Sequence, residues 1–390
     1  MSSISHMLLC SDGYPTKDDP VFPFVAQLVN ALSLMNIQVT VVAPQSLTKH
    51  FLRKTPLHPR HLCYSIEGQG VVEIFQPYSF SLGSKYRLIN RFFRKIAVNR
   101  TLKKLNKKPD ICYGHFWHCA TNLLDFAKKN KVPLFVASGE ASVEKENNIP
   151  KRVLSDFLKY YNGVIFASTK NKKESESLGF LTTQKNIVLP NAIDPAKFFK
   201  KDKHSLRLEY GIDPNVFIVV FVGAFINRKG PQRVADALKK LDEENIKAFF
   251  IGCEKDGAAC PFDYEGTLYR GVVPHEKLVD YLNMADVFVL PTLAEGCCNA
   301  IVEAMACGLP IISSNREFND DILDDECSIR INPESVDEIA EAIKALHDKP
   351  ELCEKMGGVA LGKASSLTIE KRAKAILDFM CGILYCKQMN

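Results

Sequence analysis

The 390-residue sequence lacks any apolar run close to the roughly 20 residues that a membrane-spanning helix needs. Its first residues contain no apolar stretch of the kind that a secretory signal carries. We find no internal repeat and no low-complexity segment. We therefore expect a cytoplasmic protein, either free or attached to a membrane from its cytoplasmic side. The length is sufficient for two domains, each with its own core.

The sequence also lacks the cysteine spacing of a common metal module. Its 13 cysteines are scattered, and none forms a Cys-x2-Cys pair. Cys112, His115, His118 and Cys119 are close in sequence but do not have the spacing of a zinc site. We expect buried, reduced thiols, which fits a reducing compartment, and we expect no bound metal.

Charge is distributed unevenly along the chain. Residues 1–192 carry 26 Lys and Arg against 13 Asp and Glu, whereas residues 193–390 carry 24 against 32. The first half therefore has a net charge of +13 and the second half −8, which together give the overall +5. A basic first half favours contact with an anionic surface or substrate.

The segment from Lys85 to Lys108 holds ten of these basic residues and no acidic one, with apolar residues interleaved. This pattern predicts a basic amphipathic helix that can lie on an anionic membrane. The alternative is a solvated helix whose apolar side packs on its own domain. Nucleic acid binding is less favoured, because no recognised nucleic-acid-binding module accompanies the basic residues.

Short apolar runs alternate with helical patterns throughout the chain, which predicts parallel, doubly wound sheets. The expected strands cover 7–11, 39–43, 132–138, 163–168, 186–190, 217–222, 248–252, 287–290 and 310–314, and 110–118 is expected to be a strand running into a turn. The expected helices cover 24–35, 232–241, 300–306 and 368–380.

The most informative stretch runs from Leu290 to Ser314 and reads as strand, loop, helix, strand. Glu295 stands just before the helix and Glu303 inside it, eight residues further on. Asn299 is a suitable N-cap residue. A helix N-terminus at the carboxyl edge of a parallel sheet favours an anion, and the two carboxylates can accept hydrogen bonds from hydroxyls. A nucleotide sugar has this chemistry.

Glu295-Gly-Cys-Cys-Asn-Ala-Ile-Val-Glu303, followed by Ala-Met-Ala-Cys-Gly-Leu-Pro, resembles the Glu-x7-Glu signature of glycosyltransferase family four. That resemblance implies the GT-B fold: two Rossmann-like domains facing across a cleft, with the last helix crossing back to the first domain. It places an acceptor-binding domain at 1–190 plus 367–390 and a donor-binding domain at 191–366. An ordinary βαβ crossover with a surface Glu303 is the alternative reading of the motif.

The same resemblance assigns roles to individual residues. His115, at a strand end, matches the family's histidine near the donor sugar, and Lys229 matches its diphosphate-binding lysine. The family's Arg after the strand-end Gly is replaced by Ala224, so Arg228 is the candidate substitute. The remaining implied donor contacts are Glu295 to the hexose, Glu303 to the ribose, the loop residues Gly296, Cys297, Cys298 and Asn299, and the backbone of Gly271, Val272 and Val273 to the base. Tyr14 and Glu140 are candidates on the acceptor side.

The resemblance implies retaining, metal-independent transfer of a sugar, with hexosyltransferase-like activity and no cofactor. The expected acceptor is a glycan or a lipid-diphosphate-linked glycan, as in capsule or surface-polysaccharide assembly. Three alternatives remain open: a non-catalytic nucleotide-sugar binder or scaffold, a GT-B epimerase, and a phosphorylase, although we find no pyridoxal-binding lysine context. Hydride transfer is disfavoured, because Gly68-Gln-Gly70 lacks the third glycine and the helix of a dinucleotide fingerprint.

Overall fold

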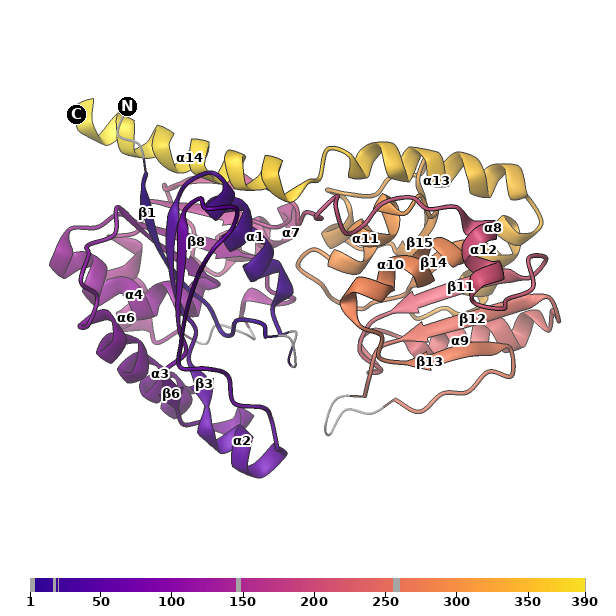
Figure 1. Ribbon diagram of the computed structural model, residues 1–390, viewed down its shortest axis with the longest axis horizontal. Coiled ribbons are helices and arrows are strands. Elements are labelled where there is room, and N and C mark those ends of the chain that lie inside the picture. The colour runs from indigo at the N-terminus through magenta and orange to yellow at the C-terminus, as the bar shows by residue number, and fades with distance from the viewer. Residues whose placement is uncertain (1–3, 17–18, 20, 145–148, 255–259, 390) are drawn as a thin grey trace. The chain divides into compact units, whose positions relative to one another are not determined.

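The computed structural model describes residues 4–16, 19, 21–144, 149–254 and 260–389. The chain divides into two compact units, Met1–Leu189 with Ile369–Asn390, and Pro190–Thr368. The boundaries expected from the sequence fall within two residues of these, at 190/191 and 366/367. Figure 1 shows both units as parallel sheets flanked by helices.

The first unit contains an eight-stranded sheet in the order β10-β9-β8-β7-β1-β2-β5-β4. Its pairs are parallel except β4 with β5. The strands are β1 (His6–Cys10), β2 (Gln38–Val42), β4 (His61–Ser65), β5 (Val71–Phe75), β7 (Ile111–His115), β8 (Leu134–Ser138), β9 (Gly163–Phe166) and β10 (Lys185–Val188), and a separate parallel pair joins β3 (Gln45–Ser46) to β6 (Tyr78–Ser79).

Seven described α-helices belong to this unit. They are α1 (Pro23–Leu34), α2 (Leu47–Arg53), α3 (Arg87–Leu102), α4 (Trp117–Asn130), α6 (Lys151–Leu158), α7 (Thr169–Ser177) and α14 (Ile369–Met389), and a short 3-10 turn, Ser84–Tyr86, precedes α3. Strands β1, β7 and β8 are buried at every position, because helices cover both faces of a parallel sheet.

The last helix, α14, packs against α1 and β9 and so completes the first unit. Ala373, Ile376 and Met380 on this helix are buried. Gly163 opens β9 under the helix, and a Cβ there would lie 2.9 Å from Ile383 Cδ1. The expected return of the last helix to the first domain is confirmed.

The second unit contains a six-stranded parallel sheet in the order β13-β12-β11-β14-β15-β16. Its strands are β11 (Phe217–Val222), β12 (Ile246–Ile251), β13 (Thr267–Gly271), β14 (Val287–Leu290), β15 (Ile311–Ser314) and β16 (Ser328–Ile331). Its helices are α8 (Lys203–Glu209), α9 (Pro231–Leu241), α10 (His275–Met284), α11 (Asn299–Ala306), α12 (Val336–His347) and α13 (Pro350–Ala364), with a 3-10 turn at Glu317–Asn319. The doubly wound architecture predicted for both domains is confirmed.

Candidate active site

The strand order of the second unit reverses between β11 and β14. The chain runs outward from β11 through β12 to β13 and then returns to place β14 on the other side of β11. Loops leaving two such neighbours diverge, and ligands of open α/β sheets bind in the crevice at this point. The loops concerned are 223–230 and 291–298, which carry Arg228, Lys229 and Glu295.

Backbone contacts hold these two loops together. Leu293 N donates to the carbonyl oxygen of Arg228 at 2.8 Å, and Arg233 Nη2 donates to that of Pro291 at 2.8 Å. Gly230, the residue before α9, has a φ of 81°, and a Cβ there would lie 2.9 Å from Pro291 O. Glycine is therefore required both by the backbone conformation and by the close approach of the loops.

Glu295 is the centre of this site. Its Oε1 lies 2.6 Å from Lys229 Nζ and 2.9 Å from Arg228 Nη1, and it accepts from Thr292 Oγ1 at 2.9 Å. Arg228 also donates to the carbonyl oxygen of Ala294. Two cations share one carboxylate, so the cluster keeps a positive charge. Among the described residues no donor meets Oε2, which leaves that oxygen for a ligand hydroxyl.

The charged forms of Glu295 and Lys229 are both stabilised in this cluster. Burial alone would raise the pKa of Glu295, but Lys229 and Arg228 outweigh it and hold that pKa below its ordinary value. Burial opposes the charged form of Lys229, but the neighbouring Cys298 sulfur and Glu295 carboxylate outweigh it and raise the pKa of the lysine. The Lys229 side chain is only 14% exposed, so at neutral pH the site presents a buried cation.

Helix α11 begins directly after this cluster. The predicted N-cap at Asn299 is wrong, because Cys298 precedes the helix and Asn299 is its first residue. The Asn299 amide oxygen instead accepts from Asn191 Nδ2 at 2.7 Å, and Asn191 Nδ2 also donates to Cys297 O at 2.9 Å. Gly296 is buried with both cysteines. No side chain of the described residues forms a geometric capping hydrogen bond with the first turn, but the Cys298 sulfur lies against the N–H groups of Ala300 and Ile301. A helix N-terminus of this kind favours an anion.

Glu303 lies inside α11 and is buried. Its Oε1 is 3.5 Å from His275 Nε2, a partner that sequence spacing did not indicate. His275 opens α10 just after the predicted base-binding residues. Of these, Gly271 ends β13 with a φ of 150°, and Val272 O accepts from Tyr269 at 2.9 Å. The ribose and base contacts predicted for Glu303 and Gly271–Val273 stay predictions.

In the first unit the strand order reverses between β1 and β7, and His115 is the last residue of β7. Its ring is buried between Phe24 and Phe116, with centroid distances of 5.2 and 4.8 Å. Nδ1 is buried without a hydrogen-bond partner among the described residues. Burial, with smaller effects from Arg372 and His118, lowers the pKa of His115 to about 3. The ring is therefore neutral at physiological pH.

The two predicted acceptor-side residues are both deeply buried and hydrogen-bonded within the unit. Tyr14 shares a 2.7 Å hydrogen bond with the hydroxyl of Tyr64. Glu140 is 1% exposed; it accepts from Trp117 N at 3.3 Å and from Ser138 Oγ at 2.7 Å. Glu140 thus anchors the start of α4, and an acceptor role for either residue stays a prediction.

Sequence reasoning missed a polar cluster at the same reversal point. His118 Nε2 lies 2.8 Å from Asp12 Oδ1, and Arg94 also pairs with Asp12. Among the described residues, Asp12, His118 and Cys119 form a group whose ligand atoms lie within 4.8 Å of one another. These residue types can hold a metal ion, but Arg94 already supplies a cation to the carboxylate.

The predicted helix within 85–108 is present as α3. Its buried residues, Ala97, Val98, Thr101 and Leu102, lie in the C-terminal half, whereas Leu88 and Phe92 in the N-terminal half are exposed. The apolar side of α3 is thus only partly covered by its own domain. Over the residues that the structure describes, none of the helices has the length and hydropathy required to span a bilayer.

Comparison with known proteins gives a match to the family described as "Glycosyl transferases group 1" over residues 202–360. The chain is 24% identical over 327 residues to TuaC of Bacillus subtilis, described as a teichuronic acid biosynthesis glycosyltransferase, covering 81% of this chain and 82% of TuaC. It is 30% identical over 165 residues to the Escherichia coli UDP-Gal:alpha-D-GlcNAc-diphosphoundecaprenol alpha-1,3-galactosyltransferase, covering 38% and 41% of the two chains.

Solved structures share the fold. Sucrose-phosphate synthase from Thermosynechococcus elongatus superposes with a TM-score of 0.77 at 16% identity, covering 99% of both chains. HepE from Anabaena, in complex with UDP, superposes with a TM-score of 0.74 at 15% identity, covering 97% of this chain and 100% of HepE. The fold that this chain shares with them, with two doubly wound units in one chain, is the GT-B fold.

Proposed function

Because the chain is a GT-B glycosyltransferase whose second unit carries the group 1 domain, we propose that it transfers a sugar from a nucleoside-diphosphate sugar, with retention at the anomeric carbon and without a metal ion. The observation that carries the proposal is the cluster of Glu295, Lys229 and Arg228 at the strand reversal, in front of α11. In this proposal the two cations and the helix N-terminus bind the diphosphate leaving group as it develops charge.

In this proposal the leaving diphosphate is stabilised by Lys229, Arg228 and the N–H groups of the first turn of α11. Donors held in place before the reaction stabilise developing charge without the cost of reorganising water. The cations supply the positive charge that a metal ion would otherwise provide, which supports metal-independent transfer. Retention follows if the leaving phosphate takes the acceptor proton on the face from which it departs, in which case no enzymic nucleophile is needed.

Glu295 and Glu303 would hold the two hydroxyl-rich ends of the donor. Glu295 offers Oε2 to a hexose hydroxyl while Oε1 stays bound to its three protein donors. Glu303, further along α11, would accept from the ribose. His115 is proposed as a neutral hydrogen-bonding group for the sugar, supported by its unpartnered Nδ1.

We propose a UDP-hexose as donor and a lipid-diphosphate-linked glycan of a surface polysaccharide as acceptor. HepE, of the same fold, binds UDP and UDP-glucose. The similar E. coli enzyme uses UDP-Gal and a diphosphoundecaprenol-linked sugar, and TuaC is described as acting in teichuronic acid biosynthesis. The basic segment 85–108 supports peripheral contact with the anionic cytoplasmic face of a membrane.

The test is nucleotide release. Purified protein is offered a panel of nucleotide sugars, with and without membrane extract, beside Glu295→Ala and Lys229→Ala. Lys277→Ala and Glu341→Gln, exposed in the same unit, control for loss of charge. Release from one donor, stimulated by extract and lost only in the two site variants, supports transfer and names the donor. Binding without release across a wide acceptor panel would favour the non-catalytic binder or scaffold.

A further inference from the structure

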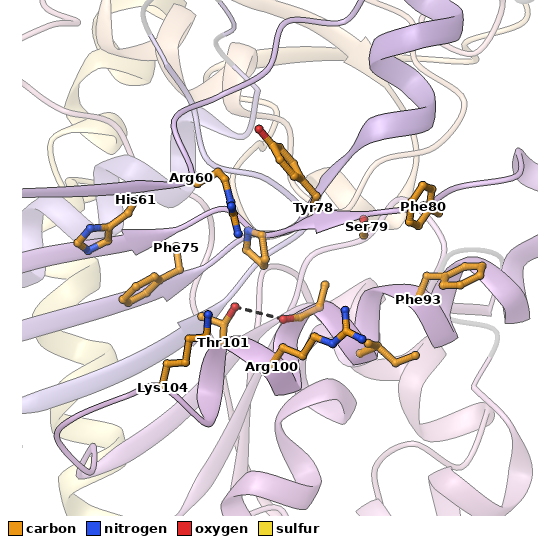
Figure 2. A pocket seen from close by; sticks show the side chains of 13 residues that line it. Arg60, His61, Phe75, Tyr78, Ser79, Phe80, Phe93, Arg100, Thr101 and Lys104 are labelled. Carbon is orange, nitrogen blue, oxygen red and sulfur yellow. Dashed lines mark hydrogen bonds between the residues drawn. The ribbon is translucent and has the colours of Figure 1, made fainter.

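A pocket of about 790 Å³ lies in the first unit, between α3 and the strands β4, β5 and β6, outside the site described above. Figure 2 shows Arg60 and Tyr78 on one side of it and Arg100, Thr101 and Lys104 on the other. Phe80 and Phe93 lie together at one end, and His61 and Phe75 at the opposite end. The pocket thus combines cationic walls with an aromatic end.

The cations that line this pocket are not paired with a carboxylate of any described residue. Arg60, Arg100 and Lys104 form no ion pair with any other residue that the structure describes, and no acidic residue lines the pocket. Glu73 lies nearby, but its Oε1 is bound to His61 Nε2 at 3.1 Å. Arg60 rests over the ring of Tyr78, 5.2 Å from its centroid. Three unpaired cations around one cavity favour an anionic ligand.

Two of the pocket's hydroxyls, those of Ser79 and Thr101, are already committed as donors. Ser79 Oγ donates to Gln45 O at 3.2 Å, and Thr101 Oγ1 donates to Ala97 O at 3.1 Å. The charged donors that the pocket offers to an anion are the two guanidinium groups and the ammonium group. Arginine binds phosphate oxygens in a bidentate manner, so a phosphoryl group suits these walls.

The aromatic end of the pocket opens onto exposed apolar side chains. The ring of Phe93 lies 5.7 Å from that of Phe80 and 5.9 Å from that of Phe92, and Phe92 is 61% exposed. Ser81 N donates to Thr48 Oγ1 at 3.1 Å, which ties the loop after β6 to α2. Further exposed residues of α2, this loop and the start of α3 are Phe51, Leu52, Leu82, Tyr86, Leu88 and Ile89. Exposed large apolar side chains beside a pocket favour contact with another apolar surface.

We infer that this pocket binds the phosphorylated headgroup of an anionic glycerophospholipid within a bilayer, while its acyl chains lie over Phe80 and Phe93. The phosphodiester is matched by the cations and the hydrocarbon by the exposed apolar side chains. A soluble phosphate ester has no hydrocarbon chain that could contact the exposed apolar side chains. The inference rests on the proposed membrane contact and adds a specific lipid site to it.

The test is sedimentation of the full-length protein with vesicles of phosphatidylcholine alone or mixed equally with phosphatidylglycerol. The pocket variant is Arg100→Ala with Lys104→Ala; the matched control, Lys129→Ala with Lys185→Ala, removes the same charge from exposed positions of the same unit. Because each cation at the surface strengthens binding several-fold, we expect the pocket variant to lose about tenfold or more in partitioning. The control should lose less than about threefold, because distant charges are screened.

Two further arms define the ligand. Arg100→Lys keeps the charge but loses the bidentate geometry, and we expect it to bind less well than the wild type. Glycerol 3-phosphate should not displace the protein from vesicles. Equal losses in the pocket and control variants, or displacement by glycerol 3-phosphate, would overturn the lipid site while the membrane contact stands. Absence of wild-type binding to either vesicle would overturn the membrane contact as well, without bearing on donor turnover.

Discussion

Replacing Glu295 by Gln tests the centre of the proposed donor site with little change in the shape of the side chain. The amide keeps an oxygen where Lys229, Arg228 and Thr292 now donate, but it removes the negative charge. A hydrogen bond to a charged group contributes about 1.5–3 kcal/mol. If Glu295 holds a sugar hydroxyl through such a bond in the transition state, kcat/KM should fall roughly ten- to hundredfold.

The measurement is steady-state nucleotide release at saturating acceptor, together with thermal unfolding of both proteins. The pKa of Glu295 is held below its ordinary value of 4.5, so its charge contributes stability that is present above about pH 4.5 and is lost as pH falls through the lower folded-state value. The difference in Tm between wild type and Glu295→Gln should therefore shrink in acid. Glu341→Gln should change neither quantity.

An unchanged kcat/KM with a lowered Tm would refute the role of Glu295 in the donor site, because the carboxylate would then only neutralise its two cations. A loss of turnover with no change in Tm at any pH would refute the charge coupling that the distances imply. Only a fall in both kcat/KM and Tm supports a role of Glu295 in binding the donor together with its charge coupling to the two cations.

Lys229→Ala should lower kcat for nucleotide release by about 10²–10³, the usual effect of removing one donor to a developing anion, in stopped or continuous assays. Gly230→Ala should lower the free energy of unfolding by roughly 1–2 kcal/mol, since its φ is 81° and Pro291 O blocks the new Cβ. In the same denaturation experiment Gly362→Ala, at an open helical position, should be neutral or stabilising. His115→Gln should lose less stability than the wild type as pH falls below 6.5. In the wild type the unfolded state protonates this ring while the folded state, with its pKa of about 3, does not, and this lowers the free energy of unfolding by about 1.4 kcal/mol per pH unit.

The position of Glu295 could be predicted because its signals are local. Glu295 and Glu303 lie in one strand-loop-helix segment, so the pattern places Glu295 at a sheet edge, whereas Lys229 and Arg228 were assigned from the family resemblance. The predicted strands Phe217–Val222 and Val287–Leu290 match the observed β11 and β14 residue for residue. Periodicity of apolar residues is sufficient for buried parallel strands.

Contacts between segments that are distant in the sequence could not be predicted from local patterns. The sequence suggested that Asn299 caps the helix, but its side chain instead accepts a hydrogen bond from Asn191, more than a hundred residues earlier. Asp12 and His118 meet only because β1 and β7 are neighbours in the sheet. The first unit's β4–β5 hairpin was also missed; Glu67 and Gly68 at its turn both have positive φ, as a type I′ turn requires.

The placement of α14 has a consequence for exchanging parts between related enzymes. The chain passes between the units twice, at 189/190 and again at 368/369, so the second unit is an insertion within the first. A single proteolytic cut at either crossing would sever the covalent link between α14 and the rest of the first unit, which would then be held together by packing alone. A chimera that exchanges the second unit therefore needs two junctions, and a fragment ending at residue 189 would lose the helix that covers Gly163.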